Sequence, residues 1–210
     1  MDGLLYIKAS PRGPRSHSIA VADAFLEAYL EKNPDAPVTV ATRNLFETDL
    51  PPFDGPTLQA KYNVIHGLTH DPAQHKAWET VKRYVEELKT CRMLVMAVPM
   101  WNFALPYRLK HYIDLVVQPG LSFGVNENGS FGMIEDKPVF IAYASGGQYP
   151  AGSAAAVMDH QRPYLEMILN FMGLTNIRSV RVEATLSGDE TVAQSRAGAI
   201  KAARELAARF

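Results

Sequence analysis

The chain has 210 residues, and 47% of them are hydrophobic, which is enough to fill the core of one domain spanning residues 1–210. The formal net charge is −1, without a basic block or an acidic tail, so no nucleic-acid partner is expected and small molecules are the expected partners. Cys91 is the only cysteine, which excludes an internal disulfide, and no run approaches the roughly 18 apolar residues of a membrane span, so we expect a cytoplasmic protein without a membrane partner.

Apolar runs alternate with helical patterns along the chain, which is typical of βαβ units and a mainly parallel sheet covered by helices on both faces. In chain order, strands are predicted at 4–9, 38–44, 93–98, 139–144 and 177–184. Helices are predicted at 18–32, 72–90, 105–117, 154–172 and 190–208. Residues 53–70 are expected to form a long irregular connection, and Asn128-Gly129 to form the turn of a small hairpin.

Three serines follow the first predicted strand. Ser10, Ser16 and Ser18 lie between this strand and the first helix, with Ser18 as its candidate N-cap and His17 in reach of a bound group. Unpaired N–H groups and the helix dipole favour an anion there. The loop matches neither G-x-G-x-x-G nor G-x-x-x-x-G-K-[ST], so a phosphate monoester is favoured over a dinucleotide or magnesium–ATP. The same residues can also simply cap a helix and shape a turn.

An aromatic loop follows the third predicted strand, from Met100 to Phe103. Trp101 and Phe103 can lie beside an aromatic ring, while the Asn102 amide and the backbone N–H groups can pair with the polar edge of that ring. The alternative is that these aromatic side chains only cover the end of a core strand.

A glycine-containing turn, Ala144-Ser145-Gly146-Gly147, follows the fourth predicted strand. Glycine lets backbone N–H groups approach a ligand closely, because no Cβ intervenes. In isolation the same turn can also be a plain connection between a strand and a helix.

Two other patterns point to different chemistry. Ser122 lies in a G-x-S-x-G sequence, which in serine hydrolases needs a strand before the serine and a helix after it. Here a predicted helix precedes Ser122 and a turn follows, so a serine hydrolase is a less favoured alternative. His66, His70 and His75 have no acidic partner at ligand-like spacing, so no metal site is expected.

Together these segments resemble the FMN-dependent NADH:quinone oxidoreductases and azoreductases, which are dimeric enzymes of the flavodoxin-like fold. The likeness extends over nearly the whole chain, and residues 99–123 carry its most specific part: P-M-W-N-F, an L-K-x-Y-x-D helix and G-L-S-F. The resemblance implies an α/β three-layer sandwich with a five-stranded parallel sheet of order 2-1-3-4-5. Flavodoxin itself is the standard example of that order, with its ligand at the switch between strands one and three.

The resemblance also implies FMN as the cofactor and NADH or NADPH as the electron donor. Hydride chemistry on FMN then needs no catalytic side chain. We expect the flavin to pass two electrons to quinones, and to azo or nitroaromatic compounds, by ping-pong kinetics in a homodimer. The phosphate would lie at Ser10, Ser16, His17 and Ser18, and the ring at Met100, Trp101, Asn102, Phe103, Ala144, Ser145, Gly146 and Gly147.

Backbone N–H groups around Asn102, Gly146 and Gly147 are expected to orient the ring and to stabilise the negative charge that it gains on reduction. Many relatives have tyrosine in place of Trp101 and Ser-Arg-Gly-Gly in place of the 144–147 turn, so polar contacts near the ring are expected to differ. The alternatives are a flavodoxin-like electron carrier, for which a charge of −1 is a poor match, and a flavin-binding module without catalytic turnover.

Overall fold

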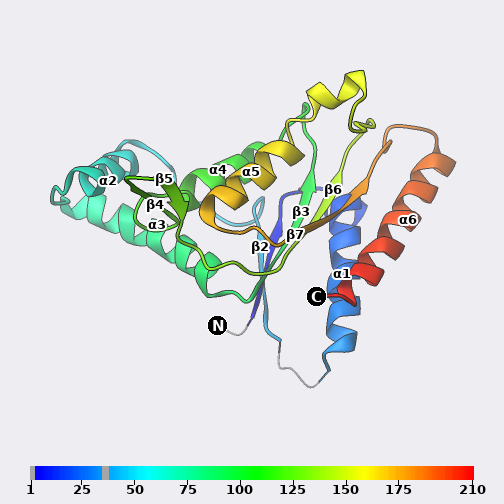
Figure 1. Ribbon diagram of the computed structural model, residues 1–210, viewed down its shortest axis with the longest axis horizontal. Coiled ribbons are helices and arrows are strands. Elements are labelled where there is room, and N and C mark those ends of the chain that lie inside the picture. Colours follow the sequence, from blue (N-terminus) through cyan, green and yellow to red (C-terminus); the bar gives the residue numbers. More distant parts are fainter. Residues whose placement is uncertain (1–2, 35–37) are drawn as a thin grey trace.

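The computed structural model describes residues 3–34 and 38–210, which form three layers (Figure 1). Within this part of the chain, the middle layer is a parallel sheet of five strands in the order β2-β1-β3-β6-β7. Its strands are β1 (Leu4–Lys8), β2 (Val40–Asn44), β3 (Met93–Pro99), β6 (Val139–Ala144) and β7 (Ile177–Val182). Strands β4 (Phe123–Asn126) and β5 (Gly129–Gly132) form a separate antiparallel hairpin.

Helices cover both faces of the sheet. Figure 1 shows α1 (His17–Lys32) and α6 (Asp189–Ala207) on one face, and α3 (Pro72–Thr90), α4 (Tyr107–Val116) and α5 (Arg162–Met172) on the other. Helix α2 (Gly55–His66) packs against α3. Two short 3-10 helices, η1 (Gly13–Arg15) and η2 (Ala154–Met158), lie in the connections after β1 and β6.

The central strands separate two hydrophobic cores because successive side chains of a strand point to opposite faces. On β3, Met96 and Val98 belong to the core under α3, α4 and α5, while Val95 and Ala97 belong to the core under α1 and α6. All four side chains are at most 2% exposed. These strands therefore read as continuous apolar runs, as expected for a parallel sheet covered on both sides.

The predicted strand order needs one correction. A hairpin is confirmed in this segment, but its turn is at Glu127-Asn128 and Gly129 begins β5. The hairpin adds two strands between β3 and β6, so the described residues form seven strands and the order of the central sheet is 2-1-3-6-7 instead of 2-1-3-4-5. The flavodoxin-like α/β arrangement with a parallel sheet is confirmed, and β1 and β3 lie side by side at its centre.

Two predicted segments were wrong. Residues 53–70 are not an irregular connection, because Asp54 caps α2 by accepting the N–H of Thr57, and Gly67 ends it with a φ of 66°. Residues 154–172 are not one helix. The Asp159 carboxylate accepts the N–H groups of Gln161 and Arg162, which breaks η2 from α5.

Candidate functional site

The carboxyl ends of β1 and β3 mark the switch point of the sheet. The chain leaves β1 toward α1 on one face and leaves β3 toward α4 on the opposite face (Figure 1). Strand β6 pairs in parallel with β3, so its following loop lies at the same edge. The topology therefore brings the three loops predicted from the sequence to the edge where open α/β sheets bind their ligands.

The loop after β1 places three buried serines at the start of α1. Ser10, Ser16 and Ser18 are 1%, 3% and 0% exposed. Ser16 is the N-cap of α1, not Ser18 as expected: its Oγ accepts the N–H of Ile19 at 3.4 Å and shares a hydrogen bond with the Ser18 Oγ at 3.2 Å. The Ser10 Oγ accepts the N–H of Arg12 at 3.4 Å. The serine hydroxyls thus form a polar cluster at a helix N-terminus.

His17 is the first residue of α1, and cationic side chains lie around it. Its Nδ1 is buried and has no hydrogen-bond partner within the described residues. Burial, followed by the positive charges of Arg196 and Arg12, lowers the pKa of His17 from its ordinary value. His17 and Arg196 line the same surface groove. The helix N-terminus and two guanidinium groups together suit an anion such as a phosphate.

The loop after β3 is a tight turn with two residues at positive φ. Trp101 and Ala104 exchange two backbone hydrogen bonds of 2.9 Å, and between them Asn102 and Phe103 have φ values of 46° and 68°. Positive φ at both central positions is the pattern of a type I′ turn. Both central residues are exposed, and their backbone N–H groups donate no hydrogen bond within the described part of the chain. This turn presents two free donors at the sheet edge.

The aromatic side chains of this loop point to different neighbours. The Trp101 ring packs in an aromatic cluster, with its centroid 5.5 Å from that of Phe46 and 6.3 Å from that of Tyr107. The Phe103 ring instead meets Tyr149 of the β6 loop edge to face, with centroids 6.4 Å apart. Phe103 therefore faces the other ring-binding loop, and Trp101 packs toward the residues that follow β2 and begin α4.

The turn after β7 holds the loop after β6 through hydrogen bonds. The carbonyl of Ser145 accepts hydrogen bonds from the N–H and the Oγ1 of Thr185, both at 3.1 Å, while the Ser145 Oγ donates to the Gly147 carbonyl at 2.9 Å. The N–H groups of Gly146 and Gly147 donate to no other backbone or side-chain group of the described residues. A Cβ on Gly146 would lie 2.6 Å from a Leu186 methyl group, so glycine allows this close approach.

The three loops are linked at their bases. The N–H of Met100 donates to the Ala144 carbonyl at 2.7 Å, which joins the second and third loops. The N–H of Ala9, just before the first loop, donates to the Ala97 carbonyl at 2.9 Å. The structure thus brings every residue of the predicted site to one edge of the sheet, although Ser18 and Trp101 are largely occupied by contacts within the chain.

A family model described as having the flavodoxin-like fold matches residues 3–207. A protein of Nitratidesulfovibrio vulgaris (strain DP4) named FMN-dependent NADH:quinone oxidoreductase is 50% identical over 211 aligned residues, which cover 100% of both chains. The chain belongs to this flavodoxin-like family.

Two solved structures have the same fold as this chain. An azoreductase from Bacillus anthracis str. Sterne superimposes with a TM-score of 0.90 at 25% identity, covering 100% of each chain. An FMN-dependent NADH-azoreductase from Bacillus anthracis str. Ames Ancestor, solved in complex with FMN, has a TM-score of 0.85 at 27% identity and covers 99% of this chain and 100% of its own.

The structure gives Ser122 of this family member a structural role. Its side chain is fully buried, its Oγ accepts the N–H of Gln118 at 2.8 Å, and it donates to the Gln118 carbonyl at 3.3 Å. Ser122 follows α4 and precedes β4, which is the reverse of the strand and helix that a nucleophile elbow needs. These contacts argue against the serine hydrolase.

Metal and membrane sites receive no support from the described residues. No three His, Cys, Asp or Glu side chains gather closely enough among them to hold a metal ion. No helix there is long and apolar enough to cross a bilayer.

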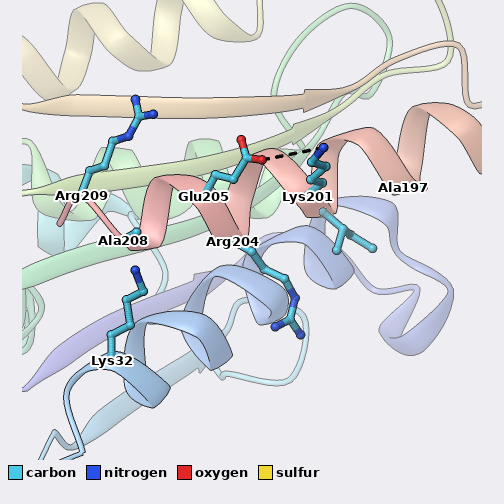
Figure 2. Close-up of a pocket in the computed structure, with 8 residues that line it drawn as sticks. Lys32, Ala197, Lys201, Arg204, Glu205, Ala208 and Arg209 are labelled. Atoms are coloured by element: carbon cyan, nitrogen blue, oxygen red, sulfur yellow. Dashed lines mark ion pairs between the residues drawn. The ribbon is translucent and has the colours of Figure 1, made fainter.

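A groove lined by basic residues lies away from the three loops, between α1 and α6 near their carboxyl ends (Figure 2). Figure 2 shows Lys201 beside Glu205, and Arg204 also pairs with Glu27. Acidic side chains therefore partly neutralise Lys201 and Arg204, two of the cations that line the groove.

Sequence reasoning missed the residues that support the loops. Tyr149 faces Phe103, Glu183 accepts the N–H of Tyr149 at 3.4 Å, and Asp159 caps the segment under the β3 loop. Tyr149 lies beyond the strand predicted at 139–144, Asp159 lies inside the helix predicted at 154–172, and Glu183 lies inside the strand predicted at 177–184. The charged residues Arg181 and Glu183 at the end of β7 were the available signal, because charged side chains that are partly shielded from water usually have partners.

Proposed function

We propose that this chain is an FMN-dependent NADH:quinone oxidoreductase that also reduces azo compounds. The observation that carries the proposal is the full-length, 50% identical relative of that name, together with free backbone donors on the loops after β3 and β6, at the sheet edge that contains the switch point. An azoreductase of the same fold was solved with FMN, which supports azo reduction and the cofactor. Use of NADPH and reduction of nitroaromatic compounds are finer parts of the proposal.

The residues of the first loop fit the FMN phosphate. Ser10, Ser16, His17 and Ser18 surround the N-terminus of α1, with Arg12 and Arg196 nearby. The Ser16 Oγ accepts the Ile19 N–H, which leaves its own proton for an anion when Ser18 donates to it. The buried Nδ1 of His17 supplies a further polar atom without a partner in the described residues.

The residues of the other two loops fit a flat ring with a polar edge. We assign the ring to Met100, Trp101, Asn102 and Phe103, and to the turn Ala144, Ser145, Gly146 and Gly147. When bound, FMN supplies the two-electron chemistry. The free N–H groups of Asn102, Gly146 and Gly147 are fixed by their turns, so they can stabilise negative charge at the ring edge without reorganising. The Phe103 and Tyr149 rings, which meet edge to face, would cover one side of it.

The kinetic mechanism in this proposal is ping-pong. Both ring-binding loops come from one edge of the sheet, which leaves a single open side for the nicotinamide donor and the acceptor to use in turn. Initial rates at several fixed quinone concentrations should give parallel double-reciprocal lines against NADH. Intersecting lines would show that donor and acceptor bind together, and the shared side would be wrong.

The proposal includes a homodimer with two equivalent sites. Large apolar side chains are exposed on α2 and on the hairpin: Tyr62 48%, Ile65 49%, Val125 70% and Phe131 45%. Exposed apolar surface of this kind marks interaction sites, and most homo-oligomers are symmetric dimers. Residues 53–70 and 123–131 and Phe171 are proposed to line the partner's site, although Phe171 also packs on Phe123 at 4.7 Å.

Sedimentation of the wild type and of the Phe131→Glu variant tests the dimer. A dimer that dissociates in the variant supports it, and a fully active wild-type monomer at nanomolar concentration contradicts it. Leu30→Glu, on α1, is the matched control at an exposed apolar residue of another surface. A cytoplasmic location is also proposed, and its support is the single, buried Cys91.

An absorbance spectrum tests the function directly. The purified protein is mixed with excess FMN, freed of unbound FMN, and titrated with NADH without oxygen. Yellow bands that bleach with NADH and return with a quinone support the enzyme. A colourless protein contradicts it, slow bleaching favours a flavin-binding module, and a stable one-electron-reduced state favours an electron carrier.

A further inference from the structure

Arg181, near the end of β7, contacts two carboxylates from different parts of the chain. Its Nη2 lies 3.4 Å from Asp159 Oδ2 and 2.8 Å from Glu183 Oε1. The side chains of Arg181 and Asp159 are 24% and 8% exposed, so these ion pairs are partly shielded from water. Arg181 belongs to neither loop of the proposed ring site, but each of its partners supports one of them.

Asp159 supports the loop after β3. Its Oδ1 accepts the N–H groups of Gln161 and Arg162, both at 3.1 Å, which fixes the turn between η2 and α5. In that turn, the N–H of His160 donates to the Phe103 carbonyl at 2.9 Å. The Gln161 Nε2 donates to the carbonyl of Val98, in β3, at 3.0 Å. The position of the Asn102-Phe103 turn therefore depends on the Asp159 segment.

Glu183 supports the loop after β6. Its Oε1 accepts the N–H of Tyr149 at 3.4 Å, and its own N–H donates to the Ser195 Oγ at 3.1 Å. The next residue, Ala184, has a φ of 57°, and Thr185 then holds Ser145 through two hydrogen bonds. The position of the 145–149 loop therefore depends on the turn that begins at Glu183.

We propose that Arg181 is a positioning residue that sets the spacing between the two ring-binding loops. Apart from the Met100 to Ala144 hydrogen bond at their base and the contact between Phe103 and Tyr149, the two loops are held by separate supports. One guanidinium joins these supports, because its Nη2 lies within reach of both carboxylates. The free donors of both loops then meet one flat ring at a fixed separation. This inference rests on the proposed function.

FMN affinity of the variants tests the inference. Binding is followed at low temperature by the quenching of FMN fluorescence, and thermal unfolding of each apo-protein is measured alongside. Arg181→Gln should weaken FMN binding about tenfold. Arg181→Lys should recover only part of this loss, because lysine keeps the positive charge but its ammonium group is a single point charge. Arg178→Gln is the matched control: it lies on the same strand, where its guanidinium stacks over the Phe210 ring, and its FMN affinity should match the wild type.

A double-mutant cycle separates positioning from plain stability. Asp159→Asn and Glu183→Gln should each weaken FMN binding severalfold in the wild type and have little further effect in Arg181→Gln, because the tie is already broken. A role in stability alone would lower the unfolding temperature and leave FMN affinity unchanged.

The outcomes are distinguishable. If the wild type binds FMN and folded Arg181→Gln binds it equally well, the inference is overturned. If Arg181→Gln does not fold, Glu183→Gln and Arg181→Lys decide: unchanged affinity in both overturns it. If the wild type itself does not bind FMN, the proposed function fails instead.

Discussion

Replacing Ser16 by alanine separates its structural role from its proposed role in binding. The Ser16 Oγ accepts the N–H of Ile19 and shares a hydrogen bond with the Ser18 Oγ at 3.2 Å. Loss of an N-cap costs about 1 kcal/mol of unfolding free energy. Loss of a hydrogen bond to a charged phosphate costs about 1.5–3 kcal/mol of binding free energy. At 1.4 kcal/mol per factor of ten, the Kd for FMN should rise by about 10-fold to 150-fold.

The matched control is Asp71→Ala. Asp71 caps α3 in a capping box with Gln74, away from the three loops, so its loss should lower the unfolding free energy by a similar amount. Urea denaturation of both apo-proteins gives the stability, and fluorescence titration gives the FMN affinity. Only Ser16→Ala should bind FMN more weakly. Equal stability losses with wild-type FMN affinity in both variants would refute the reasoning and leave Ser16 as a helix cap alone.

Three further outcomes follow from the structure. The pKa of His17 is lowered in the folded protein, so as pH falls below about 6.5 the unfolded chain binds the proton more readily than the folded protein does. Between pH 7.5 and 5.5 the free energy of unfolding, measured by urea denaturation, should therefore fall more for the wild type than for His17→Asn. Gly132→Ala should lower the free energy of unfolding by about 2 kcal/mol, because its Cβ would collide with the backbone at the end of α5. Gly198→Ala, on α6, should raise it by about 0.5–1 kcal/mol, because a Cβ there would lie in open space. Ser122→Ala should lower the unfolding free energy by about 1–3 kcal/mol and leave quinone reduction per folded molecule unchanged.

Much of the fold was predictable because its signals are local. The runs that became β3 and β6 are apolar on both faces, and this pattern is the expected one for parallel strands between two helix layers. Proline at 72 and glycine at 173 are local start and stop signals, and they match the observed ends of α3 and α5. The position of the three loops at one sheet edge followed from the strand order, which the family resemblance supplied.

The rest depended on contacts between distant residues. Helix α2 carried local signals in Asp54 and Gly67, but the two prolines before it suggested a loop. The break before α5 depends on one carboxylate, that of Asp159, which accepts backbone N–H groups. A helical periodicity of apolar residues does not predict such a hydrogen bond. The placement of Trp101 against Phe46 was also hidden, since these residues are more than fifty positions apart.

The site therefore depends on two groups of residues: those that supply the donors, and those that set the distance between the donors. The donors for the ligand come from short, local turns: the serines at the start of α1, the type I′ turn at Asn102, and the paired glycines after β6. The separation between these turns is set by residues far along the chain, after η2 and after β7. Because a rigid flat ring requires fixed donor spacing, substitutions under the loops should affect cofactor affinity as strongly as substitutions in the loops themselves. A variant that keeps all three local motifs but lacks the ion pairs of Arg181 should fold, and it should bind FMN more weakly than the wild type.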